Sequence, residues 1–177
     1  MLRLLAAAAL VGTSAAFAPA ATRGARSTAR RSAAVSYPEN DALIEVGAAV
    51  PAVTLQKNKD EQEDVTLAAL LADSGGGSTV LVGVPAAFSP TCSDTHIPGF
   101  VDTAADMAAL GVARTVVMSV NDRFVMKAWG KALGLPEIAF SADVYTRPEL
   151  LADGAGNVAS ALGLLTDKGA MGGRCKR

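Results

Sequence analysis

The stretch Val80–Phe100, which reads VLVGVPAAFSPTCSDTHIPGF, decides the fold. It opens with the apolar run Val80–Val84, and a run without polar alternation is typical of a strand covered on both faces of a sheet. Pro85 ends that run. Ser89 then stands where a helix N-cap would, and Pro90 follows at the first helical position, where a missing N–H costs nothing. The sequence therefore predicts a buried strand, a turn and a helix.

Cys92 falls in the first turn of that predicted helix. A thiol there faces unpaired backbone N–H groups and the positive end of the helix dipole, and both favour the thiolate, the nucleophilic form of cysteine. Its neighbours Thr91, Ser93 and Asp94 are polar, so the pattern does not place Cys92 on a core face. The hydroxyl of Ser89 could hydrogen-bond an oxyanion at the same helix start. The pattern indicates an activated cysteine; the alternative is a small buried apolar residue, the usual state of a lone cysteine.

A resemblance to a known family favours the activated cysteine. The segments Pro85–Ser93 and His96–Phe100 together resemble the active-site signature of the peroxiredoxins, in particular of the type II or peroxiredoxin-5 subfamily. The chain also resembles further blocks of that subfamily, at Ser119–Trp129 and later at Leu150–Gly154 and Ala161–Leu164.

The resemblance implies a thioredoxin-like fold and a thiol-specific peroxidase. Such an enzyme reduces hydrogen peroxide and organic hydroperoxides to water and alcohols, because the Cys92 thiolate attacks a peroxide oxygen and becomes a sulfenic acid. Glutathione with glutaredoxin, or thioredoxin, would restore the thiol. The resemblance also implies a role in antioxidant defence and redox homeostasis, without a bound cofactor.

The same resemblance implies further site residues. Ser89 takes the place of the signature threonine and keeps its hydroxyl, and Pro85 and Thr91 belong to the signature as supporting residues. The family's arginine lies in a Gly-x-Arg-Ser-x-Arg block before a late strand. Here that block is Gly172–Arg177, which reads GGRCKR, so Arg174 is the match. Without the resemblance, Arg174 would be a solvated cation in a basic tail.

His96 is the only histidine in the chain and lies four residues after Cys92. On an α-helix that spacing puts both residues on one face. His96 could serve as a base, but a thiolate formed by a helix end and an arginine needs none. A structural histidine with satisfied hydrogen bonds is therefore the favoured interpretation. One histidine and two cysteines, Cys92 and Cys175, also lack the close ligand spacing of a metal site.

Cys175 is the sole internal candidate for a resolving cysteine, because Val117 stands where the plant relatives carry theirs. Cys175 takes the place of a family serine. We expect it to be an ordinary residue at a strand start, and the chain to work with Cys92 alone.

The first 38 residues read as two targeting segments. Residues 1–16 place the short apolar run Leu4–Val11 behind a basic start, which is typical of a secretory-type signal and too short for a membrane span. Residues 17–38 are rich in Arg, Ser and Ala and free of acid, as in a transit peptide. Their join, Ser14–Pro19, resembles the cleavage motif of bipartite leaders for complex plastids. The expected location is the plastid, with the mitochondrion as the alternative.

Residues 39–177 suit a single redoxin domain. Five of the 16 basic residues of the chain lie in the leader, so this domain holds 11 basic and 17 acidic residues and a net charge of −6. No basic face remains, and neither nucleic acid nor a membrane is an expected partner.

Apolar runs alternate with helical patterns along this domain, which favours a mostly parallel α/β sheet. Together with the resemblance, they predict a thioredoxin-like α/β fold with a central mixed sheet flanked by helices. The expected strands are Val50–Leu55, Val80–Val84, Thr115–Val120 and Ile138–Phe140. The expected helices are Asp64–Ala72, ended by Ser74–Gly77, then Cys92 to about Leu110 with a bend at Pro98–Gly99, Phe124–Leu133 and Val158–Leu164. Met126 and Trp129 are expected in the core or at the interface of a homodimer.

The resemblance implies two further strands and a helix after the position of Arg177, so we expect residues 39–177 to lack the family's C-terminal end. An uncovered sheet edge would favour aggregation. Three functions stay open: a peroxidase, a sensor or relay that passes Cys92 oxidation to a partner protein, and a non-catalytic interaction module.

Overall fold

A five-stranded sheet forms the centre of the computed structural model, which describes residues 42–57, 64–135 and 147–176 of the chain. Within these residues the strand order is β2-β1-β5-β4-β3. β3 pairs in parallel with β4, and β4 with β5, whereas β1 is antiparallel to both β5 and β2. The strands are β1 (Thr54–Lys57), β2 (Asp64–Thr66), β3 (Ser78–Val84), β4 (Val112–Ser119) and β5 (Glu149–Ala152).

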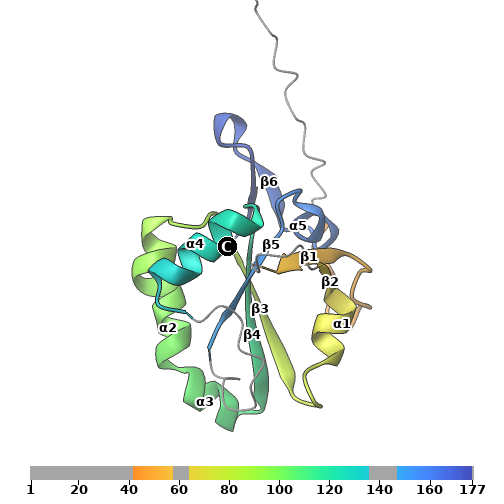
Figure 1. The fold of residues 1–177 in the computed structure, drawn as a ribbon. Coiled ribbons are helices and arrows are strands. Elements are labelled where there is room, and N and C mark those ends of the chain that lie inside the picture. The colour runs from red at the N-terminus through yellow and green to blue at the C-terminus, as the bar shows by residue number, and fades with distance from the viewer. Residues whose placement is uncertain (1–41, 58–63, 136–146, 177) are drawn as a thin grey trace, which may run out of the picture. The chain divides into compact units, whose positions relative to one another are not determined.

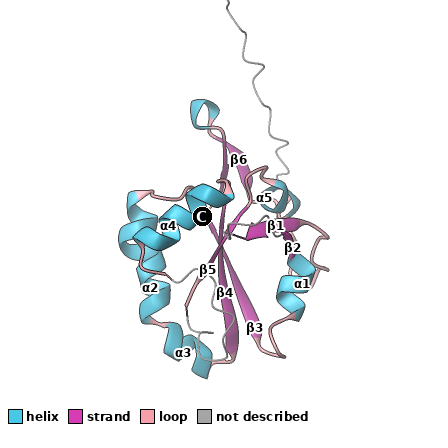
Figure 2. Cartoon of the chain, in the orientation of Figure 1, coloured by secondary structure: helices cyan, strands magenta, loops and turns pink. Residues whose placement is uncertain are grey.

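Helices cover both faces of this sheet, with α2, α3 and α4 on one side and α1 and α5 on the other (Figure 1). They are α1 (Leu67–Ala72), α2 (Ile97–Asp102), α3 (Ala104–Ala109), α4 (Arg123–Ala132) and α5 (Asn157–Ala161). Figure 2 shows the same layers by type of secondary structure. The predicted α/β fold, a mixed central sheet flanked by helices, is confirmed. In the described ranges, no helix combines the length and apolar character that a membrane span requires.

Alternate residues of β4 divide the core into two clusters. Val116 and Met118 pack with residues of α1 and α5, which we call the α1/α5 core. Val117 points to the opposite face and packs with residues of α2 and α4, the α2/α4 core. The large α4 side chains Met126 and Trp129 are buried there, as expected.

A hairpin of β6 (Leu165–Asp167) and β7 (Gly173–Cys175), joined by the 3-10 turn Gly169–Met171, lies beside β3. Its residue Cys175 belongs to the α1/α5 core, and its Sγ occupies the space that a side chain at Gly83 of β3 would need. Gly83 therefore lets the hairpin approach the sheet closely.

Two predicted elements near the start of the domain were wrong in their extent. The strand expected at Val50–Leu55 begins only at Thr54, because the Val53 N–H turns back to the carbonyl of Pro51 at 2.9 Å. The helix expected at Asp64–Ala72 begins at Leu67, and the three residues before it form β2.

The predicted end of that helix is confirmed in position. The last helical residue is Ala72, and the Ser74 hydroxyl donates to the carbonyl of Leu71 at 2.8 Å. Gly75 and Gly76 follow with positive φ angles, which glycine adopts without strain.

The long helix expected from Cys92 to Leu110 is divided into three segments. Cys92–His96 forms a π-helical turn, in which the Ile97 N–H reaches back five residues to the Cys92 carbonyl. Pro98 follows directly and cannot donate a hydrogen bond, so the irregular turn lies ahead of the expected bend. The break itself falls at Thr103, between α2 and α3, where the Thr103 hydroxyl donates to the Gly99 carbonyl at 2.7 Å.

The remaining boundaries differ from expectation by a few residues. β4 starts three residues earlier than predicted and ends one earlier, at Ser119, while α4 runs Arg123–Ala132 and α5 ends at Ala161. The short strands β5 and β6 were not predicted, because runs of three or four residues carry no clear periodicity. Cys175, expected at the start of a strand, is the last residue of β7. The strand expected at Ile138–Phe140 lies outside the described residues.

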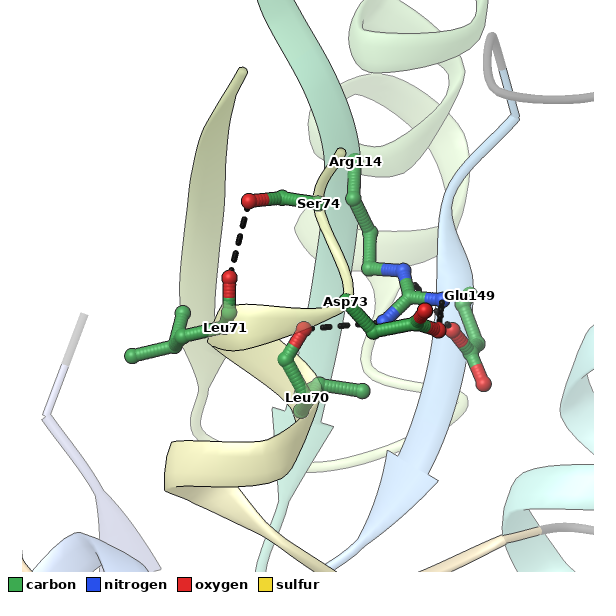
Figure 3. Close-up of polar contacts among 6 residues, drawn as sticks. All are labelled: Leu70, Leu71, Asp73, Ser74, Arg114 and Glu149. Carbon is green, nitrogen blue, oxygen red and sulfur yellow. Dashed lines mark hydrogen bonds and ion pairs between the residues drawn. The ribbon is translucent and has the colours of Figure 1, made fainter. Parts of the chain in front are cut away.

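Arg114 of β4 anchors the end of α1 to the sheet (Figure 3). Its Nη1 donates to the carbonyl of Leu70 at 2.9 Å, one of the last carbonyls of the helix, which have no helical partner. Nη2 donates to Asp73 at 3.2 Å, and Nε lies 3.8 Å from the Glu149 carboxylate of β5. Arg114 is buried, and these partners offset the free-energy cost of burying its positive charge.

We expect Arg114→Met to lower the free energy of unfolding by about 3 kcal/mol, because it leaves the Glu149 carboxylate and the Leu70 carbonyl without the guanidinium. Urea unfolding followed by circular dichroism measures the change. The matched control is Asp73→Asn, which removes the exposed partner and should cost less than about 1 kcal/mol. Equal losses in both variants would contradict a buried anchor.

Gly83→Ala should destabilise the fold by about 1–3 kcal/mol, because the added methyl group meets Sγ of Cys175. The double variant Gly83→Ala/Cys175→Ala should recover most of the loss in the same urea experiment. Gly99→Ala is the control, since nothing lies within 4 Å of a Cβ there. A double variant as unstable as the single one would show that Cys175 is not the obstacle.

Candidate functional site

The segment between β3 and α2 carries the predicted nucleophile. β3 ends at Val84, the chain turns, and it is helical from Pro90 onward, so Ser89 and Pro90 hold the positions that the sequence predicts. The Ser93 N–H donates to the Ser89 carbonyl at 2.9 Å and closes the first helical turn. Cys92 lies within this turn, where backbone N–H groups have no helical partner.

Cys92 is completely buried, with 0% of its surface exposed. It belongs to the α2/α4 core, beside Val84, Ile97 and Trp129. The expectation that its polar neighbours keep Cys92 off a core face was wrong. Those neighbours are partly or fully exposed, but the π-helical turn directs the Cys92 side chain inward.

The turn before the helix is tight and includes a strained residue. The Ser89 hydroxyl donates to the carbonyl of Ala86 at 2.9 Å and caps no backbone N–H, unlike the usual N-cap serine. Phe88 has a φ of 59°, the left-handed conformation that few residues other than glycine adopt. Pro85 is half-buried and Thr91 is exposed.

His96 ends the π-helical turn. Its ring lies 5.4 Å from the ring of Phe100, centroid to centroid. The Nδ1 atom is buried and has no hydrogen-bond partner among the residues that the structure describes. The expectation of a structural histidine with satisfied hydrogen bonds therefore fails for this nitrogen.

Cys175 and Arg174 are neighbours on β7, so their side chains point to opposite sides of the strand. Burial, with a smaller contribution from the negative charge of Asp153, raises the pKa of the Cys175 thiol to about 12. Cys175 lies in the α1/α5 core and Cys92 in the α2/α4 core, on opposite faces of the sheet. Arg174 is half-buried, and its side chain forms no hydrogen bond or ion pair with the described part of the chain.

Asp153 is a buried acid that the sequence analysis did not consider. Its carboxylate accepts from the backbone N–H groups of Val158 at 3.1 Å and Ala159 at 2.8 Å, at the start of α5. Burial raises the pKa of Asp153 above its ordinary value, although these hydrogen bonds oppose the shift. Asp153 therefore holds the start of α5 in place, and we assign it no part in the chemistry of Cys92. No cluster of three or more His, Cys, Asp or Glu side chains suited to a metal occurs in the described ranges.

Two further residues contact the segment around Cys92. The Asn121 side-chain oxygen accepts from the Ala87 N–H at 2.9 Å, and the Trp129 indole N–H donates to the Ser93 hydroxyl at 3.0 Å. The available signal for Asn121 was its place directly after a buried parallel strand, where sheet proteins gather their functional side chains. No pattern marks Trp129 as more than a core residue.

Comparisons with known proteins agree with this arrangement. Residues 45–177 match the family model described as Redoxin. The chain is 40% identical over 139 residues to Peroxiredoxin-2B of Arabidopsis thaliana, covering 77% of this chain and 79% of the relative. It is 43% identical over 129 residues to the chloroplastic Peroxiredoxin-2E-2 of Oryza sativa subsp. japonica, covering 71% of this chain and 52% of that protein.

A similar solved structure is the reduced Prx3 of Vibrio vulnificus in complex with hydrogen peroxide. It shares 36% sequence identity with this chain at a TM-score of 0.61, covering 75% of this chain and 77% of that one. The family model and these relatives agree with the thioredoxin-like arrangement of the sheet and helices. The chain therefore belongs to the redoxin family and, within it, to the peroxiredoxins.

Proposed function

We propose that this chain is a one-cysteine thiol peroxidase of the type II, or peroxiredoxin-5, kind, in which Cys92 is the nucleophile. Membership of the peroxiredoxins makes thiol peroxidase and antioxidant activity the class of function. The observation that carries the residue assignment is the position of Cys92 in the first turn of the helix that follows β3. The hydrogen peroxide complex of the similar Vibrio vulnificus protein supports hydrogen peroxide as a substrate.

In the proposed reaction the Cys92 thiolate attacks one oxygen of a hydroperoxide. A sulfur–oxygen bond forms as the oxygen–oxygen bond breaks, so the sulfur is oxidised by two electrons and the peroxide is reduced. The leaving oxygen takes a proton and departs as water or an alcohol. A reducing thiol then attacks the Cys92 sulfenic acid with loss of water, and a second thiol releases the disulfide and restores Cys92.

Ser89 and Arg174 would stabilise the oxygens of the bound peroxide. The Ser89 hydroxyl stands at the helix start, and a rotation from the Ala86 carbonyl would aim its O–H at the substrate. The Arg174 guanidinium would supply the positive charge that the thiolate and the leaving oxygen need. Pro85 and Thr91 would shape the loop, and His96 would hold it without acting as a base.

The reductant would be glutathione with glutaredoxin, or thioredoxin, and the enzyme would need no bound cofactor. The family relation supports a thiol reductant of the thioredoxin kind. A cycle without Cys175 is supported by the separation of the two cysteines on opposite faces of the sheet and by the raised pKa of Cys175.

We also propose a plastid location and a homodimer. The chloroplastic relative supports the plastid weakly, and a mitochondrial presequence is the alternative for the leader. Two aromatic side chains are largely exposed, Phe88 at 51% and Phe124 at 64%, and exposed apolar side chains of this kind support an interface with a second copy.

Cys92→Ser should abolish peroxide consumption and leave the fold intact, because the sulfur is the nucleophile and the hydroxyl is nearly isosteric. The assay follows peroxide loss with glutathione and glutaredoxin, or with thioredoxin, and circular dichroism checks the fold. Undiminished turnover would remove Cys92 from the reaction. If the wild-type protein reacts with peroxide but is reduced only by a partner protein, the function is that of a relay. If it does not react with peroxide at all, the function is that of an interaction module.

Cys175→Ser is the matched control for that experiment and should keep most of the turnover. Loss of turnover with a trapped sulfenic acid at Cys92 would instead show that Cys175 resolves it.

Arg174→Lys should lower the second-order rate constant with peroxide by about ten- to a hundredfold, because an ammonium group cannot replace the planar fork of donors and a charge-assisted hydrogen bond is worth about 1.5–3 kcal/mol. The alkylation of Cys92 should also need a higher pH. Arg147→Lys, at an exposed position, is the control and should change neither. An unchanged peroxide rate with superimposable alkylation curves in Arg174→Lys would exclude Arg174 from the site.

A further inference from the structure

Asn121 and Trp129 hold the segment around Cys92 at two points, one before Cys92 in the sequence and one after it. Asn121 lies in the loop that joins β4 to α4, Trp129 lies within α4, and neither belongs to the predicted site. Ala87, which Asn121 contacts, precedes Cys92 by five residues, and Ser93, which Trp129 contacts, follows it directly.

Asn121 is a fixed anchor on the first side. Its side-chain oxygen accepts two hydrogen bonds, from the Ala87 N–H at 2.9 Å and from the Ser119 hydroxyl at 2.7 Å. Its own N–H donates to the Ser119 carbonyl at 2.8 Å, and Ser119 is completely buried at the end of β4. The Ala87 N–H is therefore tied directly to the central sheet.

Trp129 is the anchor on the second side. The indole is buried in the α2/α4 core, and its N–H finds its hydrogen-bond acceptor in the Ser93 hydroxyl. Ser93 closes the first helical turn through its N–H bond to Ser89. A buried indole N–H needs such a partner, so the bond fixes the π-helical turn on α4.

A strained residue, Phe88, lies between the two anchored positions in the sequence. Phe88 follows Ala87 directly, and its ring centroid lies 6.5 Å from that of Trp129 at a tilt of 49°. A phenylalanine with a φ of 59° persists only where its surroundings determine the conformation. Here the Asn121 side chain holds the N–H of the preceding residue, Ala87, and Trp129 lies against the Phe88 ring.

We propose that Asn121 and Trp129 are positioning residues that set the orientation of Cys92 at the start of its helix. They act through their hydrogen bonds to Ala87 and Ser93. The proposal rests on the proposed role of Cys92 as the nucleophile. A segment released at either anchor would let Cys92 turn away from its place in the first helical turn, where backbone N–H groups have no helical partner.

The first test is Asn121→Ala in the full chain. We expect the rate of Cys92 alkylation by iodoacetamide at neutral pH, and the rate constant with peroxide, to fall on the order of five- to tenfold, and the alkylation profile to move to higher pH. Asn157→Ala, at an exposed asparagine, is the matched control and should change none of these. A lower urea midpoint with an alkylation profile identical to that of the wild type would overturn the proposal, since a purely structural role predicts that result.

The second test removes the donor and the acceptor of the Trp129–Ser93 hydrogen bond separately. It tests the proposal independently if Asn121→Ala does not fold. Trp129→Phe keeps an aromatic ring but deletes the N–H, and Ser93→Ala deletes the acceptor. Each should shift the alkylation profile, and the double variant should shift it no further than the larger single effect. Unshifted profiles, or shifts that simply add, would overturn the assignment.

The alkylation readout also separates this proposal from the proposed function, because it uses no peroxide. If the wild type does not react with peroxide and the alkylation profiles still shift, the peroxidase assignment fails and the positioning of Cys92 stands.

Discussion

The parallel pairing of β3 with β4 is the constraint on which the site depends. Their register sets Val84 against Ser119, so the two strands end side by side. The loop that leaves β3 therefore begins beside the residues that leave β4, and Asn121 can reach the Ala87 N–H without any further element. A shift of one residue in this register would turn every β3 side chain to the other face and break that contact.

The same alternation separates the two cysteines. Cys92 joins the face that Val82 and Val84 share, and Cys175 packs against Gly83 on the other. Burial opposes the charged form of the Cys175 thiol, and the negative charge of Asp153 opposes it further. Cys92 is buried too, but it lies in the first turn of a helix, where backbone N–H groups have no helical partner. The two buried thiols therefore lie in different secondary structure, one near a helix start and the other on a strand.

The sequence predicted the parts of the fold that rest on local rules. The apolar run of β3, the Ser89–Pro90 helix start and the α4 pattern each carry their own signal, and all three lie within two residues of where they were expected. The boundaries of β1 and β2 were missed because these short strands are defined by their pairing with each other and with the sheet, and no local pattern marks that pairing. The burial of Cys92 was missed for a similar reason: a π-helical turn has no signature in a short polar segment, yet it decides where the thiol points.

The residues of the candidate site also fall into two groups, those that are close in sequence and those that only the fold brings near. Cys92 and Ser89 are close in sequence and follow from the strand–turn–helix pattern, whereas Pro85 and Thr91 were expected from the resemblance to the peroxiredoxin signature. Asn121 lies 34 residues from Ala87 and Trp129 lies 36 residues from Ser93, so only the β3–β4 pairing and the packing of α4 join them to the site. The strained φ of Phe88 connects the two levels, because a local turn of this kind is stable only where distant residues hold it. The proposed nucleophile can therefore be predicted from one segment, whereas its orientation depends on the fold as a whole.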